Sequence, residues 1–312
     1  MNGVAGKMAS NDSRQSARHL PNVAANNNNE GTPMNKLITW PRVRRLLLNE
    51  SMQKMRRLRR IASGLAEYRQ RKALAPTHVS NIEANGCAHI QSGRTDSLLE
   101  HALERFNSMS ESDMVVQENK KFYLNCINQD DYEPSSTFMQ YALEESTLRT
   151  VGAYLGFAPY LQSIELIFSK PTGEALNRTH HFHRDLVDRR IVKIFTYITD
   201  VDEDCGPLTV LPLPVMNAAP WPVRTMPGFL PDEELSPYVD LSKAVQHVGP
   251  AGTAFAADTK RLLHMGSRCK RSRLTFVAHY NSGFGYYPRY PYHRWSPDDY
   301  DLTELQRMAV GG

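Results

Sequence analysis

The 312-residue chain has few cysteines and no long apolar run. Its cysteines, Cys87, Cys126, Cys205 and Cys269, are far apart and form no C-x-x-C pair, which argues against a disulfide framework and a thiolate zinc site. No stretch approaches the roughly 18 consecutive apolar residues of a membrane span, and residues 1–35 lack the apolar centre of a secretory signal. We therefore expect a cytoplasmic protein in a reducing compartment.

Missing motifs exclude further classes of protein. The sequence shows no repeat period, so a solenoid is not expected. It has no G-x-S-x-G elbow and no cysteine with an obvious local activator, which argues against serine and cysteine hydrolases. The acidic run from Asp200 to Asp204 has Cys205 and Leu211 where a calcium loop needs Gly and Glu, so it is predicted to be a solvated turn.

The N-terminal part divides into a tail and an arm. Residues 1–35 are rich in Asn and Ser and are predicted to be a disordered tail. Residues 36–72 hold twelve Lys and Arg against two acidic residues, although the whole chain has a formal net charge of only +4. A basic arm at 36–75 therefore precedes an acidic body. Apolar residues recur along this arm at spacings of three and four and predict an amphipathic helix that Pro76 ends: Leu48, Met52, Met55, Leu58, Ala62 and Leu65.

Two interpretations of the arm are open. A basic amphipathic helix suits an anionic membrane surface or nucleic acid, because both present phosphate groups. Alternatively, the helix packs its apolar face on its own domain and leaves its Arg side chains in water. For the body, nucleic acid is not an expected partner: the aromatic stretch Phe284–Tyr292 is more typical of a segment that wraps a domain or closes its mouth.

The body, residues 76–312, is predicted to be of the α+β or mainly β class. Asp96 is a candidate cap for a helix through Phe106, and a second helix is expected from Ser135 to Leu155, where Gly156 can end it. Short apolar runs bounded by Gly, Pro and Asp then predict strands in an antiparallel sandwich or jelly-roll core at about 160–282. These runs are Ile164–Phe168, Ile191–Ile198, Leu208–Leu211, Thr253–Ala256 and Leu274–Tyr280. An aromatic extension at 283–312 follows the core.

One group of residues indicates metal chemistry. His183 and Asp185 are two residues apart, so on a strand both side chains leave the same face and can share a metal ion. His264 follows far downstream, and a jelly roll brings distant strands together at its mouth. Two histidines and one carboxylate leave positions open on ferrous iron for a cosubstrate and oxygen. Arg273 can then hold the far end of a dicarboxylate through two parallel hydrogen bonds, with Arg271 as its alternative.

Each of these histidines also has an ordinary structural interpretation. His183 and Asp185 can form a hydrogen-bonded pair on a surface strand, and His264 can be a satisfied core histidine. His180 and His181 fall on both faces of a strand relative to His183, so we treat them as loop residues or as supports of the ligands.

Taken in order, the motifs resemble a known family. H-x-D at 183–185 is followed by the K-x-F-x-Y strand at 193–197, an acidic turn ending in Gly206-Pro207, and L-H-x-G-S at 263–267 with a later Arg. This set resembles the phytanoyl-CoA dioxygenase-like branch of the Fe(II)/2-oxoglutarate-dependent oxygenases, over about residues 81–282. The resemblance implies a double-stranded β-helix, a cupin-like jelly roll, flanked by N-terminal helices.

The resemblance also implies roles for particular residues. The expected iron ligands and catalytic residues are His183, Asp185 and His264, and Arg273 is expected to bind the 5-carboxylate of 2-oxoglutarate. Three further residues are expected beside the cosubstrate or substrate: Lys193, Phe195 and Ser267. The implied cofactors are Fe(II), 2-oxoglutarate as cosubstrate and molecular oxygen.

The expected reaction is hydroxylation of a small-molecule or carrier-linked substrate, with succinate and CO₂ as co-products. Asp185 favours hydroxylation, since halogenating members of the family lack this carboxylate. Two alternatives stay open. The jelly roll could be an inactive scaffold that the basic arm tethers to a membrane or nucleic acid, or the chain could be a cupin-like metalloenzyme that does not use 2-oxoglutarate. The Pro-rich insert at 211–248 is expected to be a specificity loop or a plain surface excursion.

Overall fold

The computed structural model describes most of the chain from residue 40 onward. The described residues are 40–77, 80–116, 123–171, 173, 176, 178–225, 228–266, 268–286 and 294–311, and within the first helix the side chains of 40–43, 45 and 46 are not described. The predicted tail at 1–35, Ser267 and most of the aromatic stretch lie outside these residues.

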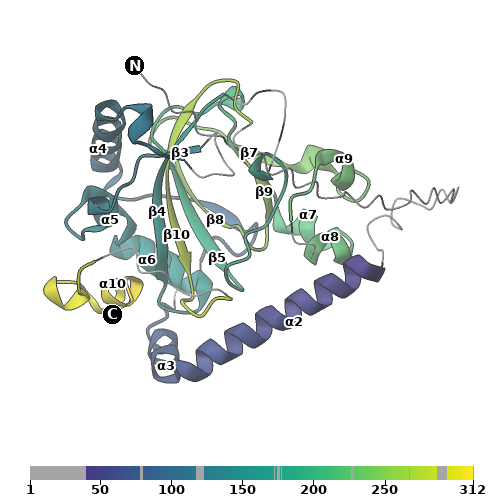
Figure 1. Cartoon of the computed structure of the whole chain (residues 1–312), viewed down its shortest axis with the longest axis horizontal. Helices are drawn as coiled ribbons and strands as arrows, with labels where there is room; N and C mark the ends of the chain where they lie inside the picture. Colours follow the sequence, from purple (N-terminus) through teal and green to yellow (C-terminus); the bar gives the residue numbers. More distant parts are fainter. Residues whose placement is uncertain are drawn as a thin grey trace, which may run out of the picture.

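Two antiparallel sheets form the centre of the described chain (Figure 1). The larger sheet has the strand order β1-β8-β5-β10-β4-β3-β2, and the smaller has the order β7-β6-β9. The strands are β1 Cys87–Ile90, β2 Val115–Val116, β3 Tyr123–Asn125, β4 Tyr160–Ser169, β5 Ile191–Tyr197, β6 Leu208–Leu211, β7 Val245–His247, β8 Ala254–Asp258, β9 Leu263–Met265 and β10 Arg273–Asn281.

The five predicted strands are confirmed as β4, β5, β6, β8 and β10, each within a few residues of its expected bounds. Strand β10 is buried along its whole length between β5 and β4, which explains its continuous apolar run. Antiparallel sheets with flanking helices are therefore established. The double-stranded β-helix remains a prediction.

Helices cover the outer face of the large sheet. Figure 1 shows α4 (Thr95–Ser108), α5 (Thr137–Ala142), α6 (Glu145–Leu155) and α10 (Glu304–Ala309) on this side. Alternation along the strands sends every second side chain toward these helices. The main hydrophobic core lies at this interface and includes Leu98, Phe138, Val151, Ile164, Leu166, Ile194 and Phe276.

Two helix predictions need correction. Asp96 lies in the first turn of α4, which begins at Thr95, and Arg94 occupies the N-cap position. The helix predicted from Ser135 to Leu155 is two helices, because α5 ends at Ala142 with Leu143 as its C-cap and α6 begins at Glu145. Between them, the side chain of Glu144 accepts a hydrogen bond from the N–H of Gly93 at 3.1 Å. Gly156 ends α6 as predicted, in the left-handed conformation with φ 70°.

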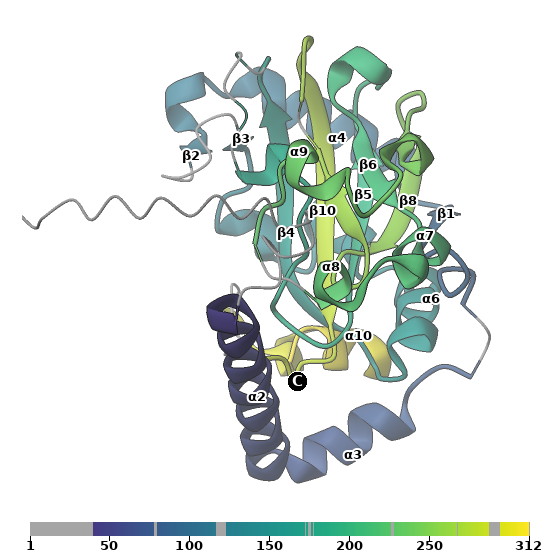
Figure 2. The same cartoon turned by 90° about the vertical axis from the view of Figure 1, so that its right-hand side faces the viewer.

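The described part of the basic arm forms two helices, α2 (Trp40–Ser63) and α3 (Leu65–Ala73), where a single helix was expected. The chain turns between them at Gly64. A Cβ atom there would lie 3.3 Å from a ring carbon of Phe284, so the glycine allows the arm to approach the body closely. Figure 2 shows α2 and α3 meeting at an angle beside the body.

Packing of the apolar face of α2 on its own domain, one of the two interpretations of the arm, is wrong. The apolar side chains of α2 point outward: Leu48 is 54% exposed, Met55 54% and Leu58 65%. The side toward the body carries Gln53, which is buried, and Arg57, which donates a hydrogen bond to the carbonyl oxygen of Phe284 at 3.1 Å. The spacing of apolar residues identified their common face, but it did not determine which way that face points.

The Pro-rich insert between β6 and β7 lies on the side of the large sheet away from α4 to α6 (Figure 1). It forms α7 (Leu213–Ala218), α8 (Trp221–Thr225) and α9 (Asp232–Leu235), with its own small core. Short 3₁₀ helices occur at Glu111–Asp113, Asp130–Tyr132, Arg178–His180, Glu203–Cys205, Leu241–Lys243 and Pro297–Asp299. Among the described residues, no helix has both the length and the apolar character that crossing a membrane requires.

Candidate metal centre

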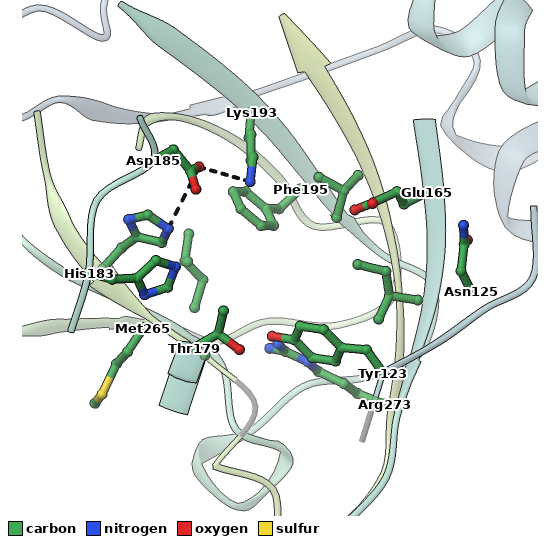
Figure 3. Close-up of a pocket in the computed structure, with 15 residues that line it drawn as sticks. Tyr123, Asn125, Glu165, Thr179, His183, Asp185, Lys193, Phe195, Met265 and Arg273 are labelled. Carbon is green, nitrogen blue, oxygen red and sulfur yellow. Dashed lines mark ion pairs between the residues drawn. The ribbon is translucent and has the colours of Figure 1, made fainter. Parts of the chain in front are cut away.

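A cavity of about 720 Å³, including its open mouth, lies between the large sheet and β9 (Figure 3). Its lining combines titratable, aromatic and small side chains: Tyr123, Asn125, Glu165, Ile167, Thr179, His183, Asp185, Lys193, Phe195, Leu208, His264, Met265, Gly266, Arg273 and Val277. Six of the seven predicted site residues therefore line one cavity: His183, Asp185, Lys193, Phe195, His264 and Arg273.

Backbone pairing brings the three predicted metal ligands together. His183 and His264 exchange backbone hydrogen bonds of 2.9 and 3.0 Å, and the N–H of Asp185 donates to the carbonyl of Thr259 at 2.9 Å. One ligand atom from each of His183, Asp185 and His264 lies within 4.8 Å of the others. Among the described residues, these three form the group that could share one metal ion. The H-x-D segment is extended, with an isolated bridge at His183 in place of the predicted regular strand.

Lys193 sets the charge of Asp185. Its Nζ atom lies 2.8 Å from Oδ2 of Asp185, and the same oxygen lies 4.0 Å from Nε2 of His264 (Figure 3). Burial raises the pKa of Asp185, but the positive charge of Lys193, assisted by the nearby histidine rings, outweighs burial and holds this pKa well below 3.8. Burial lowers the pKa of Lys193, and the charge of Asp185 outweighs it and raises this pKa above 10.5.

His264 has the protonation state that a metal ligand needs. Burial, followed by the neighbouring His183, lowers the pKa of His264 well below 6.5, so its imidazole is neutral. With a proton on Nδ1, the ring of His183 donates to the carbonyl oxygen of His181 at 3.0 Å and keeps the lone pair of Nε2 for the cavity. An ionised carboxylate beside neutral imidazoles is the donor set that holds a divalent transition metal such as Fe(II).

The structure separates the two candidate arginines. Arg273 begins β10, is 8% exposed and lines the cavity. A Cβ atom on Gly266 would lie 3.2 Å from Nη2 of Arg273, so the glycine of the L-H-x-G-S motif leaves room for the guanidinium. Arg271 is exposed and forms an ion pair with Asp202 away from the cavity. The geometry therefore favours Arg273 as the anion-binding residue.

The remaining predicted residues have different outcomes. Phe195 lines the cavity from β5, where it lies in register with Val277 of β10. Ser267 lies outside the described residues. His180 is buried in a 3₁₀ turn and is not one of the three grouped ligands; burial, assisted by the charge of Arg268, lowers its pKa to about 4.

Sequence reasoning missed four polar residues that line the cavity: Tyr123, Asn125, Glu165 and Thr179. Glu165 is a lone charged residue on the predicted strand Ile164–Phe168, and it lies in register with Val277 on the same face as Phe195. Because side chains alternate between the two faces of a strand, the sequence could have predicted that Glu165 faces the cavity. Tyr123 and Asn125 come from β3, whose three residues carried no readable strand pattern. The side-chain oxygen of Asn125 accepts the N–H of Leu166 at 3.0 Å and so binds β3 to β4.

Comparisons with known proteins give no family and no curated relative. No family model matches the sequence, and no curated protein matches it. Among solved structures, EctD from S. alaskensis with 2-oxoglutarate and 5-hydroxyectoine is 15% identical, with 67% of this chain and 80% of that chain covered and a TM-score of 0.46.

Two further structures are similarly distant. The non-heme alpha ketoglutarate dependent epimerase SnoN from nogalamycin biosynthesis is 16% identical, with 70% and 84% of the two chains covered and a TM-score of 0.45. HygX from Streptomyces hygroscopicus with nickel, 2-oxoglutarate and hygromycin B is 15% identical, with 67% and 87% covered and a TM-score of 0.46. All three TM-scores lie below 0.5.

Proposed function

We propose that the chain is an Fe(II)/2-oxoglutarate-dependent oxygenase with a double-stranded β-helix core. The observation that carries this proposal is the group of His183, Asp185 and His264, whose ligand atoms lie within 4.8 Å of one another in a cavity that Arg273 also lines. The substrate is a small molecule or a carrier-linked group, and the products include succinate and CO₂. Asp185 favours hydroxylation among the reactions of this class.

Each residue has a task that follows from its chemistry. His183, Asp185 and His264 would hold the iron and leave open positions toward the cavity. Bound iron would supply oxygen activation coupled to the oxidative decarboxylation of 2-oxoglutarate. Arg273 would bind the distal carboxylate of that cosubstrate through two parallel hydrogen bonds. Lys193 keeps the carboxylate of Asp185 ionised, as the shifted pKa of Asp185 supports.

The first test measures metal binding and cosubstrate turnover. We expect the parent protein to bind Fe(II) without oxygen and to form succinate from 2-oxoglutarate in air with ascorbate. The single variants His183→Ala, Asp185→Ala and His264→Ala should lose both properties, since each removes one of three ligands. If all three variants bind Fe(II) as tightly as the parent, the metal assignment is wrong.

The second test uses the two arginines as a matched pair. Arg273→Ala should weaken 2-oxoglutarate binding about 100-fold, because two charge-assisted hydrogen bonds are lost. Arg271→Ala removes an equal charge at an exposed position outside the cavity and should leave the affinity within about twofold. Calorimetric titration of 2-oxoglutarate in the absence of oxygen measures both. An active enzyme that is insensitive to Arg273→Ala would instead be a metalloenzyme that does not use 2-oxoglutarate.

A further inference from the structure

A second cavity adjoins the segment that carries His183 and Asp185. Consecutive side chains of an extended segment alternate in direction, so His183 and Asp185 line the first cavity while Arg184 lines the second. The second cavity has about 850 Å³ of space, including its opening to solvent. It is bounded by α2, α7, α8, the segment 184–189 and the turn at 260–261.

The lining of this cavity is strongly basic. It contains one acidic side chain, Glu50, and five basic ones: Arg184, Arg189, Arg224, Lys260 and Arg261. None of the ion pairs among the described residues involves Arg189, Arg224 or Lys260. Because the body of the chain is acidic as a whole, this concentration of positive charge is local.

Arg184 is held in place against the repulsion of the neighbouring cations. Arg184 is buried and donates to the carbonyl oxygens of Val223 at 3.0 Å and Arg261 at 3.4 Å, so its position is set by the backbone. Burial, followed by the charge of Arg184, lowers the pKa of Lys260 below 10.5. An anion in the cavity would relieve this repulsion.

We propose that this cavity binds a phosphate group. Guanidinium groups match phosphate oxygens through paired hydrogen bonds, and several cations from separate elements suit a multiply charged anion better than a single carboxylate. The cavity uses none of the residues assigned to iron or 2-oxoglutarate, so the inference does not depend on the proposed reaction. The phosphate can belong to a soluble ligand or to a lipid headgroup.

The test is a titration of the full-length protein with pyrophosphate at constant ionic strength. We expect saturable binding that weakens at least tenfold in the Arg224→Gln/Lys260→Gln double variant, because two cations are lost. The control, Arg271→Gln, removes an exposed positive charge elsewhere and should leave binding within twofold. Failure of the parent to bind pyrophosphate, or an equal loss in the control, overturns the soluble-ligand form of the proposal.

Vesicles of phosphatidic acid distinguish the source of the phosphate. If the double variant loses only pyrophosphate binding, the ligand is soluble; if it also loses vesicle binding relative to Arg271→Gln, a lipid headgroup can occupy the cavity. If it loses neither, the cavity is not a phosphate site. Asp185→Ala should keep pyrophosphate binding even though it lacks a proposed iron ligand, and this separates failure of the phosphate site from failure of the oxygenase assignment.

The outward face of α2 supports a second, independent proposal. Besides its exposed apolar residues, this helix exposes Lys54, Arg56 and Arg59. Its one acidic residue, Glu50, lines the basic cavity on the side toward the body. The exposed surface is therefore apolar and cationic together, and Figure 1 shows the helix running along an edge of the molecule.

We infer that this face lies on an anionic membrane surface. Apolar side chains can enter the boundary between headgroups and acyl chains while Lys and Arg contact the lipid charges. A second copy of the same helix would instead bring equal positive charges together, which opposes a dimer through this face. The charge therefore selects a membrane over self-association.

The test is cosedimentation of the full-length protein with vesicles of phosphatidylcholine, with or without phosphatidylglycerol. We expect binding only with the anionic lipid, at least a fivefold loss in Met55→Gln/Leu58→Gln, and weaker binding at high salt. Leu103→Gln changes an exposed leucine of α4 and serves as the control. The proposal is overturned if the parent does not bind these vesicles, or if the double variant dissociates a dimer seen by sedimentation velocity.

Discussion

Arg271 and Arg273 are two residues apart, yet they lie in different environments. Strand β10 begins at Arg273, so this side chain is held by sheet pairing at the wall of the cavity. Arg271 still belongs to the preceding turn, where its N–H donates to the carbonyl of Asp204 at 3.0 Å. The start of one strand therefore decides which arginine can contact a ligand in the cavity.

Gly206 shows how one residue shapes the acidic turn. It has φ 62°, and an added Cβ would lie 2.8 Å from both the backbone nitrogen of Arg268 and Sγ of Cys269. We predict that Gly206→Ala destabilises the fold by about 2–3 kcal/mol, since it adds a clash to backbone strain. Thermal unfolding measures the effect.

Gly156→Ala is the matched control for this prediction. Gly156 has a similar φ of 70°, but an added Cβ would meet no atom within 4 Å. The control should therefore lose only about 1 kcal/mol, the cost of the left-handed conformation alone. Equal losses in the two variants would show that the close approach at Gly206 has no energetic weight.

At the scale of elements, the Pro-rich insert is anchored beside the metal ligands. Its small core includes Leu263, which precedes His264 on β9, and Phe182, which precedes His183. Arg268 adds a polar link, because its guanidinium donates to both carboxylate oxygens of Asp232 at 2.8 and 2.7 Å and to the carbonyl of His180 at 2.6 Å. The insert therefore supports the segments that carry both histidines.

This link predicts a pH dependence. The hydrogen bond from Arg268 lowers the pKa of Asp232 below 3.8, so the stabilisation is present above the unfolded-state pKa and is lost as the pH falls through the folded-state pKa. Asp232→Asn should be less stable than the parent at pH 7, by at most about 1 kcal/mol because the pair is partly exposed. The difference should shrink as the pH falls toward 3, as urea unfolding at each pH can show.

A second exposed pair serves as the comparison. Asp298 accepts a hydrogen bond from Arg307 at 2.7 Å but is almost fully exposed. Asp298→Asn should change stability by less than about 0.5 kcal/mol at pH 7. A destabilisation by Asp232→Asn that stays constant from pH 7 to pH 3 would contradict the assigned ion pair.

At the scale of the whole molecule, one buried carboxylate joins the basic arm to the body. Asp188 is fully buried and accepts hydrogen bonds from Arg57 of α2, from the N–H of Arg189 and from Ser282 after β10. Three segments that are far apart in the sequence therefore meet at a single side chain. The arm also buries Arg71 of α3, which accepts the N–H of Ala158 at its carbonyl oxygen at 2.8 Å.

We predict that Arg57→Met destabilises the protein by about 3 kcal/mol, because it leaves the buried charge of Asp188 without its cation. The double variant Arg57→Met/Asp188→Asn should lose less than the sum of the two single variants, since the pair is coupled. Arg59→Met, an exposed neighbour on the same helix, should stay within about 0.5 kcal/mol of the parent. Additive losses in urea unfolding would mean that the arm is not held by this pair.

Much of the fold and of the candidate site could be predicted because the relevant signals are local. Apolar runs between turn residues identified β4, β5 and β10, and Gly156 was recognised as a helix end. The ordered motif predicts one metal site from His183, Asp185 and His264, and their ligand atoms lie within 4.8 Å of one another. Short edge strands such as β3 carried no such signal, since their pairing depends on a partner strand far away in the sequence.

The sequence by itself determined which side chains share a face, because the backbone repeats of a helix and a strand set that relation locally. Only the tertiary structure decided where each face points. It turned the apolar side of α2 outward, directed Arg184 into a basic cavity, and placed Glu165 in the wall of the metal cavity. These outcomes depend on contacts between segments that are distant in the sequence, and such contacts leave no periodic trace in either segment alone.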